Sequence, residues 1–241
     1  SHDDKNPSLT ASCNGEKILV KCQAGCTFKE IVTAVGMKQS QFFIPKEKTP
    51  TKKIVATYRY EDKDGGHVMD VVRFKPKGFR PKRPDGKWTL DGVTRVPYRL
   101  PQMLEAIKIG KDILILEGEK DCENAEKFGL VATTFAGGAG KWRKEYSEWF
   151  QDAKVICLPD NDDAGRKGMH HIASEISMVA ESVRLLELPD LLEKGDFSDW
   201  IKIEGNNLAK FNSLITKISS TWTSELVEED DNGQLLKELN Q

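Results

Sequence analysis

The sequence predicts an α/β protein in which a mostly parallel sheet is flanked by helices, preceded by a small basic α+β subdomain and a cysteine-bearing β-hairpin. Short apolar runs alternate with helix-length stretches between residues 110 and 218, a succession typical of right-handed βαβ units. Nearer the N-terminus, two pairs of strand-like runs each enclose a glycine-bearing turn. Acidic residues recur where the apolar runs end, and a parallel sheet gathers such positions at one edge.

Residues 1–44 are expected to form a small module built on a hairpin. The dipeptide Asn14-Gly15 is a strong hairpin turn signal, and strand-like runs lie on both sides of it, at residues 9–12 and 17–22. The second strand leads directly into a pair of cysteines.

A short helix completes this module, and a linker follows it. Thr27 and Glu30 have the spacing of a capping box ahead of apolar residues at helical intervals, and Gly36 ends the pattern. Residues 45–53 are polar, charged and proline-bearing, which predicts a linker.

Residues 54–109 are expected to form the basic subdomain, with strands at 54–60 and 67–74. Eight Lys or Arg stand against two Asp between residues 75 and 99, with aromatic residues interleaved. Positive charge beside flat aromatic faces suits single-stranded nucleic acid, and a solvated charged loop is the alternative. The candidate nucleic-acid-binding residues are Lys75, Lys77, Arg80, Lys82, Arg83, Trp88 and Arg99.

Residues 110–218 are expected to form the mostly parallel sheet and its helices. Four apolar runs predict its strands, at residues 112–117, 130–135, 154–158 and 183–188. A last amphipathic helix is expected at about 207–218. Residues 219–241 contain six Asp or Glu and one Lys, which predicts an acidic flexible tail.

Acidic side chains stand at the ends of three of these strands. Glu117 ends the first, Asp160 and Asp162 follow the third, and Asp196 lies past the fourth. The carboxyl ends of parallel strands share one edge, so these four carboxylates are expected to meet. A cluster of like charges is costly without a cation, and magnesium or manganese suits such oxygen ligands. Helix caps and turn formers are the alternative for single aspartates, but this group exceeds what a turn requires.

Three blocks, in their order and spacing, resemble the signature blocks of a TOPRIM domain, which DnaG-type primases, type I and II topoisomerases and several nucleases share. They read Glu-Gly-Glu-Lys-Asp (117–121), Asp-Asn-Asp-Asp-Ala-Gly-Arg (160–166) and Lys-Gly-Asp-Phe-Ser-Asp-Trp (194–200). The resemblance covers about residues 110 to 205. It implies a catalytic domain over 110–218, whose catalytic residues are Glu117, Asp160 and Asp162. By the same likeness Glu117 is the acid/base residue, Asp160, Asp162 and Asp196 hold magnesium, and Asp121 supports them.

Cys22 and Cys26 lie four positions apart, a spacing typical of zinc knuckles. With His2 they supply three of the four ligands that a structural zinc site requires. This region is similar to the zinc-binding domains of DnaG-type primases and their phage and plasmid relatives, in which a cysteine precedes the histidine. We therefore expect a zinc-ribbon-like module whose fourth ligand, a cysteine, lies upstream of Ser1. Cys13 is a possible substitute, and two thiols without a metal are the alternative.

The glycine-rich loop at residues 136–142 is a candidate phosphate contact. It is not a Walker A loop, because Phe135 stands where the first glycine belongs and Trp142 replaces the Ser or Thr that would hold magnesium. Glycine N–H groups ahead of a helix can still meet a phosphate, with Lys141 assisting, and a tight turn is the alternative. Arg166, in the first turn of the helix after the aspartates, is a second candidate.

These features predict a DNA primase of a phage, plasmid or other mobile element. It would make primers on single-stranded DNA from nucleoside triphosphates, using magnesium or manganese and zinc. No Walker motif occurs in the sequence, so a helicase would be supplied by another domain or protein. The alternatives are a TOPRIM nuclease or phosphohydrolase, and a non-catalytic module that binds single-stranded DNA during replication.

Composition excludes few other classes. The formal net charge of −2 says little about partners. No apolar run approaches the roughly 18 residues of a membrane span, and no signal peptide pattern opens the sequence. We therefore expect a cytoplasmic protein without a membrane partner. Five cysteines fit thiols or metal ligands in such a protein better than a disulfide framework.

Overall fold

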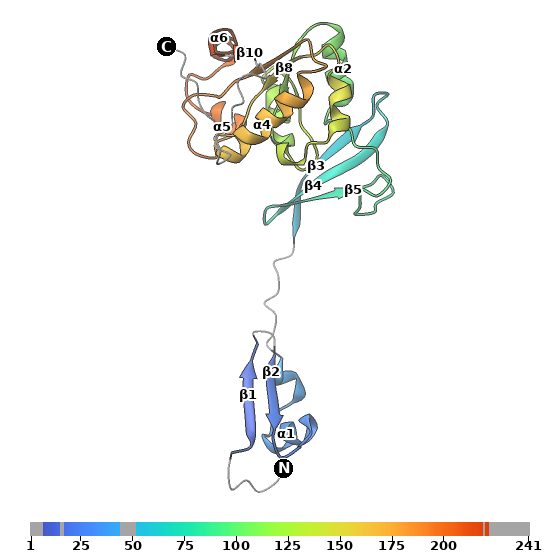
Figure 1. Ribbon diagram of the computed structural model, residues 1–241, viewed down its shortest axis with the longest axis vertical. Coiled ribbons are helices and arrows are strands. Elements are labelled where there is room, and N and C mark those ends of the chain that lie inside the picture. The colour runs from blue at the N-terminus through green and yellow to red at the C-terminus, as the bar shows by residue number, and fades with distance from the viewer. Residues whose placement is uncertain (1–6, 15–16, 44–51, 219, 222–241) are drawn as a thin grey trace. The chain divides into compact units, whose positions relative to one another are not determined.

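The computed structural model describes residues 7–14, 17–43, 52–218 and 220–221. The chain divides into two compact units, Ser1–Lys52 and Lys53–Gln241, and the elements of both are labelled in Figure 1. The division falls at the end of the expected linker, whose last residue, Lys53, already belongs to a strand.

The first unit contains the predicted hairpin. Strand β1 (Leu9–Cys13) pairs antiparallel with β2 (Ile18–Cys22), in a register that sets Leu9 opposite Cys22. Two residues of the expected turn, Gly15 and Glu16, lie outside the described residues.

The predicted capping box is confirmed at the start of helix α1 (Phe28–Ala34). Glu30 N donates to Thr27 Oγ1, and Thr27 N donates to Glu30 Oε2 at 2.7 Å. A 3-10 helix, η1 (Gln39–Phe42), follows, and its Phe42 is buried against the edge of the Phe28 ring. These apolar contacts form the small core of the first unit.

The second unit begins with an antiparallel sheet in the order β3-β4-β5. The hairpin of β3 (Lys53–Glu61) and β4 (His67–Lys75) was predicted, whereas β5 (Gly78–Lys82) lies in the basic segment, for which no strand was predicted. Pro81 in β5 stands opposite Val71. Proline lacks the backbone N–H that a central strand needs, but an edge strand tolerates it. The proline in this sequence therefore argued against a strand that the structure contains.

The larger sheet has the order β10-β9-β8-β6-β7. Its four strands β6 to β9 are mutually parallel, as predicted, and β10 pairs antiparallel with β9. The strands are β6 (Asp112–Ile115), β7 (Val131–Thr133), β8 (Lys154–Cys157), β9 (Ser182–Leu185) and β10 (Ser220–Thr221). The sheet thus includes two residues that the sequence assigned to the acidic tail; residues 219 and 222–241 lie outside the described part.

Helices surround the parallel strands of this unit (Figure 1). Helix α3 packs on β7 and α5, whereas α4 packs on β9 and η3. Because crossovers between parallel strands are right-handed, these two groups cover opposite faces of the sheet. The elements are α2 (Leu100–Lys108), α3 (Glu119–Lys127), η2 (Ala139–Lys141), η3 (Lys144–Phe150), α4 (Asp163–Ile176), α5 (Phe197–Trp200) and α6 (Leu208–Ile218).

One apolar core joins the two sheets of the second unit. Tyr60 and Met69 of the small sheet are fully buried in the same cluster as Ile113 and Ile115 of β6. The ring of Tyr60 lies 5.1 Å from that of Tyr98, just before α2. The small sheet is therefore fixed against the parallel sheet. Among the described helices, none has the length and apolar character that crossing a lipid bilayer demands.

Candidate active site

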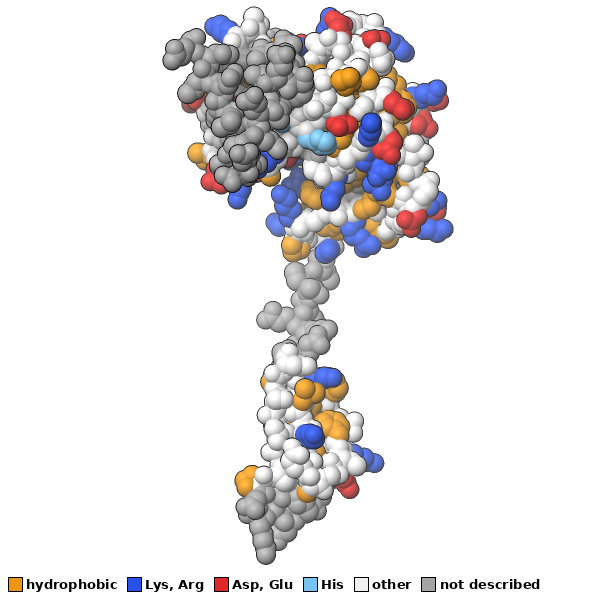
Figure 2. Space-filling view, viewed as in Figure 1, with side chains coloured by type: hydrophobic (Ala, Val, Ile, Leu, Met, Phe, Trp, Pro, Cys, Tyr) orange, Lys and Arg blue, Asp and Glu red, His pale blue; other side chains and the backbone are white. Residues whose placement is uncertain are grey.

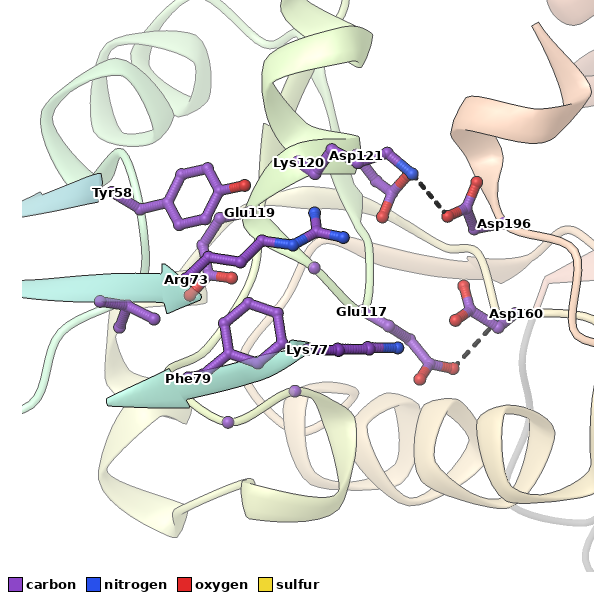
Figure 3. Close-up of a pocket in the computed structure, with 14 residues that line it drawn as sticks. Tyr58, Arg73, Lys77, Phe79, Glu117, Glu119, Lys120, Asp121, Asp160 and Asp196 are labelled. Atoms are coloured by element: carbon purple, nitrogen blue, oxygen red, sulfur yellow. Dashed lines mark hydrogen bonds and ion pairs between the residues drawn. The ribbon is translucent and has the colours of Figure 1, made fainter. Parts of the chain in front are cut away.

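Five carboxylates from three segments line one cavity of about 280 Å³ in the second unit, and four of them are predicted site residues. Glu117 follows β6, Asp121 lies in the first turn of α3, Asp160 follows β8 and Asp196 precedes α5. Figure 3 shows these side chains together at one side of the cavity. The parallel topology thus brings together residues that are up to 79 positions apart (117 to 196) in the sequence.

Glu117 is held by the backbone of the segment after β8. The N–H of Asp160 donates to Glu117 Oε1 at 3.1 Å. Gly165, at the start of α4, approaches the same oxygen so closely that a Cβ there would overlap it and lie 2.8 Å from the carbonyl oxygen of Asp160. A glycine is therefore required where α4 meets Glu117.

The cavity disfavours the ionised form of the acids that line it. Burial, together with the charges of Glu117, Asp121, Asp196 and Asp162, raises the pKa of Asp160 from 3.8 to about 8. Burial likewise raises the pKa of Glu117 and of Asp121. A bound cation would relieve this repulsion.

Asp121 and Asp196 have partners within the chain. Both the N–H of Ser198, at 3.1 Å, and its hydroxyl donate to Asp121 Oδ1. Asp196 caps α5 by accepting from the N–H of Asp199 at 2.8 Å. Lys120 Nζ donates to Asp196 Oδ2 at 2.8 Å and lies 3.8 Å from Asp121 Oδ1. A lysine therefore occupies this side of the acidic group.

Asp162 has a different position from the other predicted acids. Its carboxylate caps α4, accepting from the N–H of Gly165 at 2.8 Å, and it is not among the residues that line the cavity. Its charge nevertheless contributes to the raised pKa of Glu117, for which burial is the main cause. Asp162 is therefore close enough for its charge to act on the lining acids without lining the cavity itself.

The donor set of this cavity fits a hard divalent cation, because it consists of partly desolvated carboxylate oxygens that repel one another. As the side chains lie, the part of the chain that the structure describes has no group of three His, Cys, Asp or Glu that could hold a metal ion. The carboxylates would have to turn towards a shared ion to bind it.

The opposite wall of the cavity belongs to the small sheet. Tyr58, Arg73, Lys77 and Phe79 line it, and the Arg73 guanidinium lies 5.7 Å from the centre of the Phe79 ring. In Figure 3, Arg73 and Lys77 extend from the small sheet towards the acids. Lys77 was predicted to bind nucleic acid. The sequence did not single out Arg73 or Tyr58, because strand alternation alone does not reveal which face covers the cavity.

A buried hydrogen bond joins the two walls. Tyr60 of β3 donates its hydroxyl to Glu119 Oε1 at 2.9 Å, and both residues are buried. Burial raises the pKa of Glu119, while this hydrogen bond and the charge of Arg73 oppose the rise. Glu119, two positions after Glu117, is a further residue that the sequence reasoning missed.

The other predicted basic residues lie outside this cavity. Arg80 and Lys82 stand over the Trp88 ring, at 4.9 and 5.8 Å from its centre. The indole ring therefore already has two cationic groups next to it. Lys75 is exposed at the end of β4, and Arg83 donates to the carbonyl oxygen of Asp91 at 2.8 Å. Figure 2 shows Lys and Arg side chains gathered over the region of β3 to β5. These residues form a basic surface beside the cavity.

Arg99 is tied into the fold. It precedes α2 with a left-handed φ of 57° and forms an ion pair with Glu126 at 2.7 Å. Its predicted role in nucleic-acid binding remains a prediction.

The two predicted phosphate contacts do not line the cavity, although Gly137 and Gly138 of the glycine-rich loop do. Lys141 is exposed in η2. Arg166 donates to Asn161 Oδ1 at 3.0 Å and pairs with Asp163 at the same distance. Both roles remain predictions.

The thiols of the first unit lie at the end of β2 and just before α1. Cys22 Sγ is 3.6 Å from Ser8 Oγ, and the hydrogen bond from Ser8 is the main cause that lowers the pKa of Cys22 to about 7. Such a thiol favours metal binding. Cys26 is half-buried, Cys13 is exposed on β1, and His2 lies outside the described residues. The zinc site therefore remains a prediction.

Comparison with solved structures reveals similarity to bacterial primase domains. A DNA primase domain from Pseudomonas aeruginosa is 18% identical over 82% of this chain, with a TM-score of 0.54. The zinc-binding and RNA polymerase domains of the Aquifex aeolicus primase are 18% identical over 81%, with a TM-score of 0.55. The E. coli primase catalytic core is 17% identical over 80%, with a TM-score of 0.53.

The match covers 61%, 50% and 60% of those chains, respectively. No protein-family model and no curated protein matches the sequence. At these identities, the similarity concerns the fold: the chain has the fold of DnaG-type primase catalytic domains.

Proposed function

We propose that this protein is a DNA primase that joins nucleotides on a single-stranded DNA template by metal-dependent nucleotidyl transfer. One observation carries the proposal: acids from three segments line a cavity whose opposite wall presents the cations Arg73 and Lys77. Negative carboxylates suit metal ions, and cations suit phosphates. A cavity with both is suited to bringing a metal-bound nucleotide against a nucleic acid strand.

The acids would hold the metal. The proposed magnesium or manganese residues are Glu117, Asp160, Asp162 and Asp196, with Asp121 in support. When bound, such ions lower the pKa of a 3′-hydroxyl and stabilise the charge of the leaving pyrophosphate. Glu117 is the proposed proton acceptor: its Oε1 is engaged by the N–H of Asp160, and its raised pKa favours taking a proton.

The small sheet would orient the two nucleic acid components. Arg73 and Lys77 are placed to pair with phosphate oxygens, while Phe79, whose side chain is exposed, offers a ring for stacking a base. Trp88, which is also exposed, is a second candidate for stacking, and each of the two rings has at least one cation beside it. The template would extend from the cavity along the basic surface of β4 and β5.

The remaining parts of the proposal concern partners. Cys22 and Cys26, with His2 and a further ligand, would bind zinc in a module that helps to select the start site. A helicase domain or protein would supply unwinding. A phage, plasmid or other mobile element is the proposed origin. Zinc content of the purified full chain, measured by atomic absorption for wild type and Cys22→Ala, tests the first of these.

Primer synthesis on single-stranded DNA with NTPs or dNTPs and Mg²⁺ tests the proposed reaction. Asp160→Ala is expected to abolish it, and Asp163→Ala is the matched control, because Asp163 is exposed beside the cavity. Activity of Asp160→Ala equal to wild type would refute the proposal.

Asp162 needs a separate pair of variants, because Asp162→Ala removes both a carboxylate and a helix cap. Asp162→Ser keeps a capping hydroxyl and removes only the charge. If the carboxylate acts on the metal, both variants lose activity; if its role is capping, Asp162→Ser retains activity and folds like the wild type.

The same acids could direct water instead of a hydroxyl. Incubation with DNA or RNA and Mg²⁺, without nucleotides, separates the two reactions. Cleavage without primer synthesis would identify a nuclease, and magnesium-independent binding of single strands without either reaction would identify a binding module.

A further inference from the structure

Lys120 is a cation built into the acidic side of the cavity. It lies in the first turn of α3, between Glu117 and Asp121 in the sequence, and its ammonium group donates to Asp196 Oδ2 at 2.8 Å. Figure 3 marks this ion pair beside the separate contact of Glu117 with Asp160. The second carboxylate near Lys120, that of Asp121, is 3.8 Å away.

The lysine divides the acids into two pairs. Asp121 and Asp196 share its charge, whereas no Lys or Arg in the described ranges forms an ion pair with Glu117 or Asp160. The repulsion on Asp160 noted above therefore persists although a lysine stands in the same cavity. A divalent cation that enters meets one pair of acids without a counterion and a second pair whose charge Lys120 already offsets in part.

This ion pair differs from an ordinary surface pair. The side chains of Asp121 and Asp196 are 10% and 21% exposed, and Lys120 is 37% exposed. In the surface pair of Lys202 with Asp199, at the same 2.8 Å, the side chains are 68% and 50% exposed. Partial burial strengthens the interaction of Lys120 and makes its displacement matter.

We propose that Lys120 is an internal counterion that competes with divalent cations for Asp196 and Asp121. An ammonium group that donates to a carboxylate oxygen occupies the space in which a metal would bind that oxygen. Metal therefore binds first at Glu117 and Asp160, and reaches Asp196 only after Lys120 has turned away. The inference rests on the metal binding of the proposed function.

Titration of the full chain with Mn²⁺, without DNA or nucleotide, tests this competition. The protein is loaded with zinc beforehand, and free Mn²⁺ is counted by electron paramagnetic resonance. Lys120→Met removes the competing charge, and Lys120→Gln removes it while keeping a hydrogen-bond donor. Lys202→Met changes the net charge equally, outside the cavity.

Removing one positive charge about 4 Å from a divalent ion should strengthen binding at least about tenfold, even with the dielectric constant of water. We expect both Lys120 variants to bind Mn²⁺ at least about tenfold more tightly, or to bind an additional ion, and Lys202→Met to match the wild type. Binding of both Lys120 variants equal to or weaker than wild type would overturn the proposal, as would an equal gain in Lys202→Met.

Asp160→Ala separates this inference from the proposed function. If the wild type binds Mn²⁺ and Asp160→Ala loses that binding, metal sits in the cavity, and an unchanged affinity in the Lys120 variants refutes the competition alone. If neither the wild type nor the Lys120 variants bind Mn²⁺, both the metal chemistry and the competition fail.

Thermal unfolding gives a second readout. Without metal, Lys120→Met should lower the Tm, because Asp121 and Asp196 lose their counterion. Saturating Mn²⁺ should then raise the Tm of Lys120→Met more than that of wild type. An equal rise in both proteins would contradict the competition.

Discussion

Asp160→Asn is expected to stabilise the metal-free protein at alkaline pH while abolishing primer synthesis. Burial and the neighbouring carboxylates raise the pKa of Asp160 from 3.8 to about 8, which corresponds to at most about 6 kcal/mol of folding free energy. The side chain keeps some contact with water, and solvent screening reduces this figure to about 2–3 kcal/mol. Asparagine has nearly the same shape and no charge, so the substitution removes the penalty.

The sign of the pH dependence follows from the direction of the pKa shift. The folded protein holds the Asp160 proton more tightly than the unfolded chain does, so folding is penalised when the group is ionised. The penalty is full above about pH 8, the folded pKa, and absent below about pH 4, near the ordinary value of 3.8. The stability of Asp160→Asn should therefore equal that of the wild type at the low end of this pH range and exceed it by a growing margin towards pH 8.

Urea and thermal unfolding in EDTA at pH 5, 7 and 9 measure this difference. At pH 9 we expect a gain in Tm of about 5–10 °C for Asp160→Asn, and adding Mg²⁺ should narrow the gap by stabilising the wild type. Asp163→Asn, at an exposed position, is the control and should change stability by less than about 0.5 kcal/mol. A gain that is the same at pH 5 and pH 9, or a loss at pH 9, would refute the electrostatic reasoning.

Three further substitutions test other contacts. Tyr60→Phe should destabilise the protein by about 1–3 kcal/mol in urea unfolding, because Glu119 loses its buried hydrogen-bond donor. Gly165→Ala should destabilise it by about 1–3 kcal/mol and lower primer synthesis strongly, because the new methyl group collides with Glu117. Lys77→Ala should reduce the salt dependence of single-stranded DNA binding, lowering the slope of log K against log salt concentration by about 0.7.

Matched variants make these results specific. Tyr146→Phe is the control for Tyr60→Phe, because the buried Tyr146 hydroxyl has no hydrogen-bond partner in the structure. We expect this variant to show no loss of stability. Gly168→Ala, in the same helix α4, should be neutral or stabilising by up to about 1 kcal/mol. Lys87→Ala should leave the salt slope nearly unchanged, because Lys87 is exposed and paired with Asp85. Equal effects of test and control variants would contradict the assigned contacts.

The sequence was informative where topology alone decides the outcome. Strand ends in a parallel sheet share an edge, so the positions of Glu117, Asp160 and Asp196 after or beyond the first, third and fourth parallel strands predicted their approach. All three line one cavity. The hairpins were predictable for a related reason, because a glycine-bearing turn and its flanking apolar runs are local features.

What the sequence did not reveal depends on contacts between distant segments. Arg73 reaches the cavity because the small sheet packs on the parallel sheet through a shared core, and no pattern within β4 specifies that packing. Strand β5 was hard to predict because of its proline and positive charges, and α5 is only four residues long, about one helical turn. Asp162 looked equivalent to Asp160, yet it caps α4 instead of lining the cavity.

The hydrogen bond from Tyr60 to Glu119 also affects how molecules can enter and leave the cavity. It joins β3 to the helix that begins beside Glu117, and Tyr60 also packs in the apolar core that the small sheet shares with the parallel sheet. Separating the two walls would break this hydrogen bond and expose apolar residues that are buried between the sheets. For the proposed reaction we therefore expect nucleotides and product to enter and leave by the open side of the cavity while its two walls stay together.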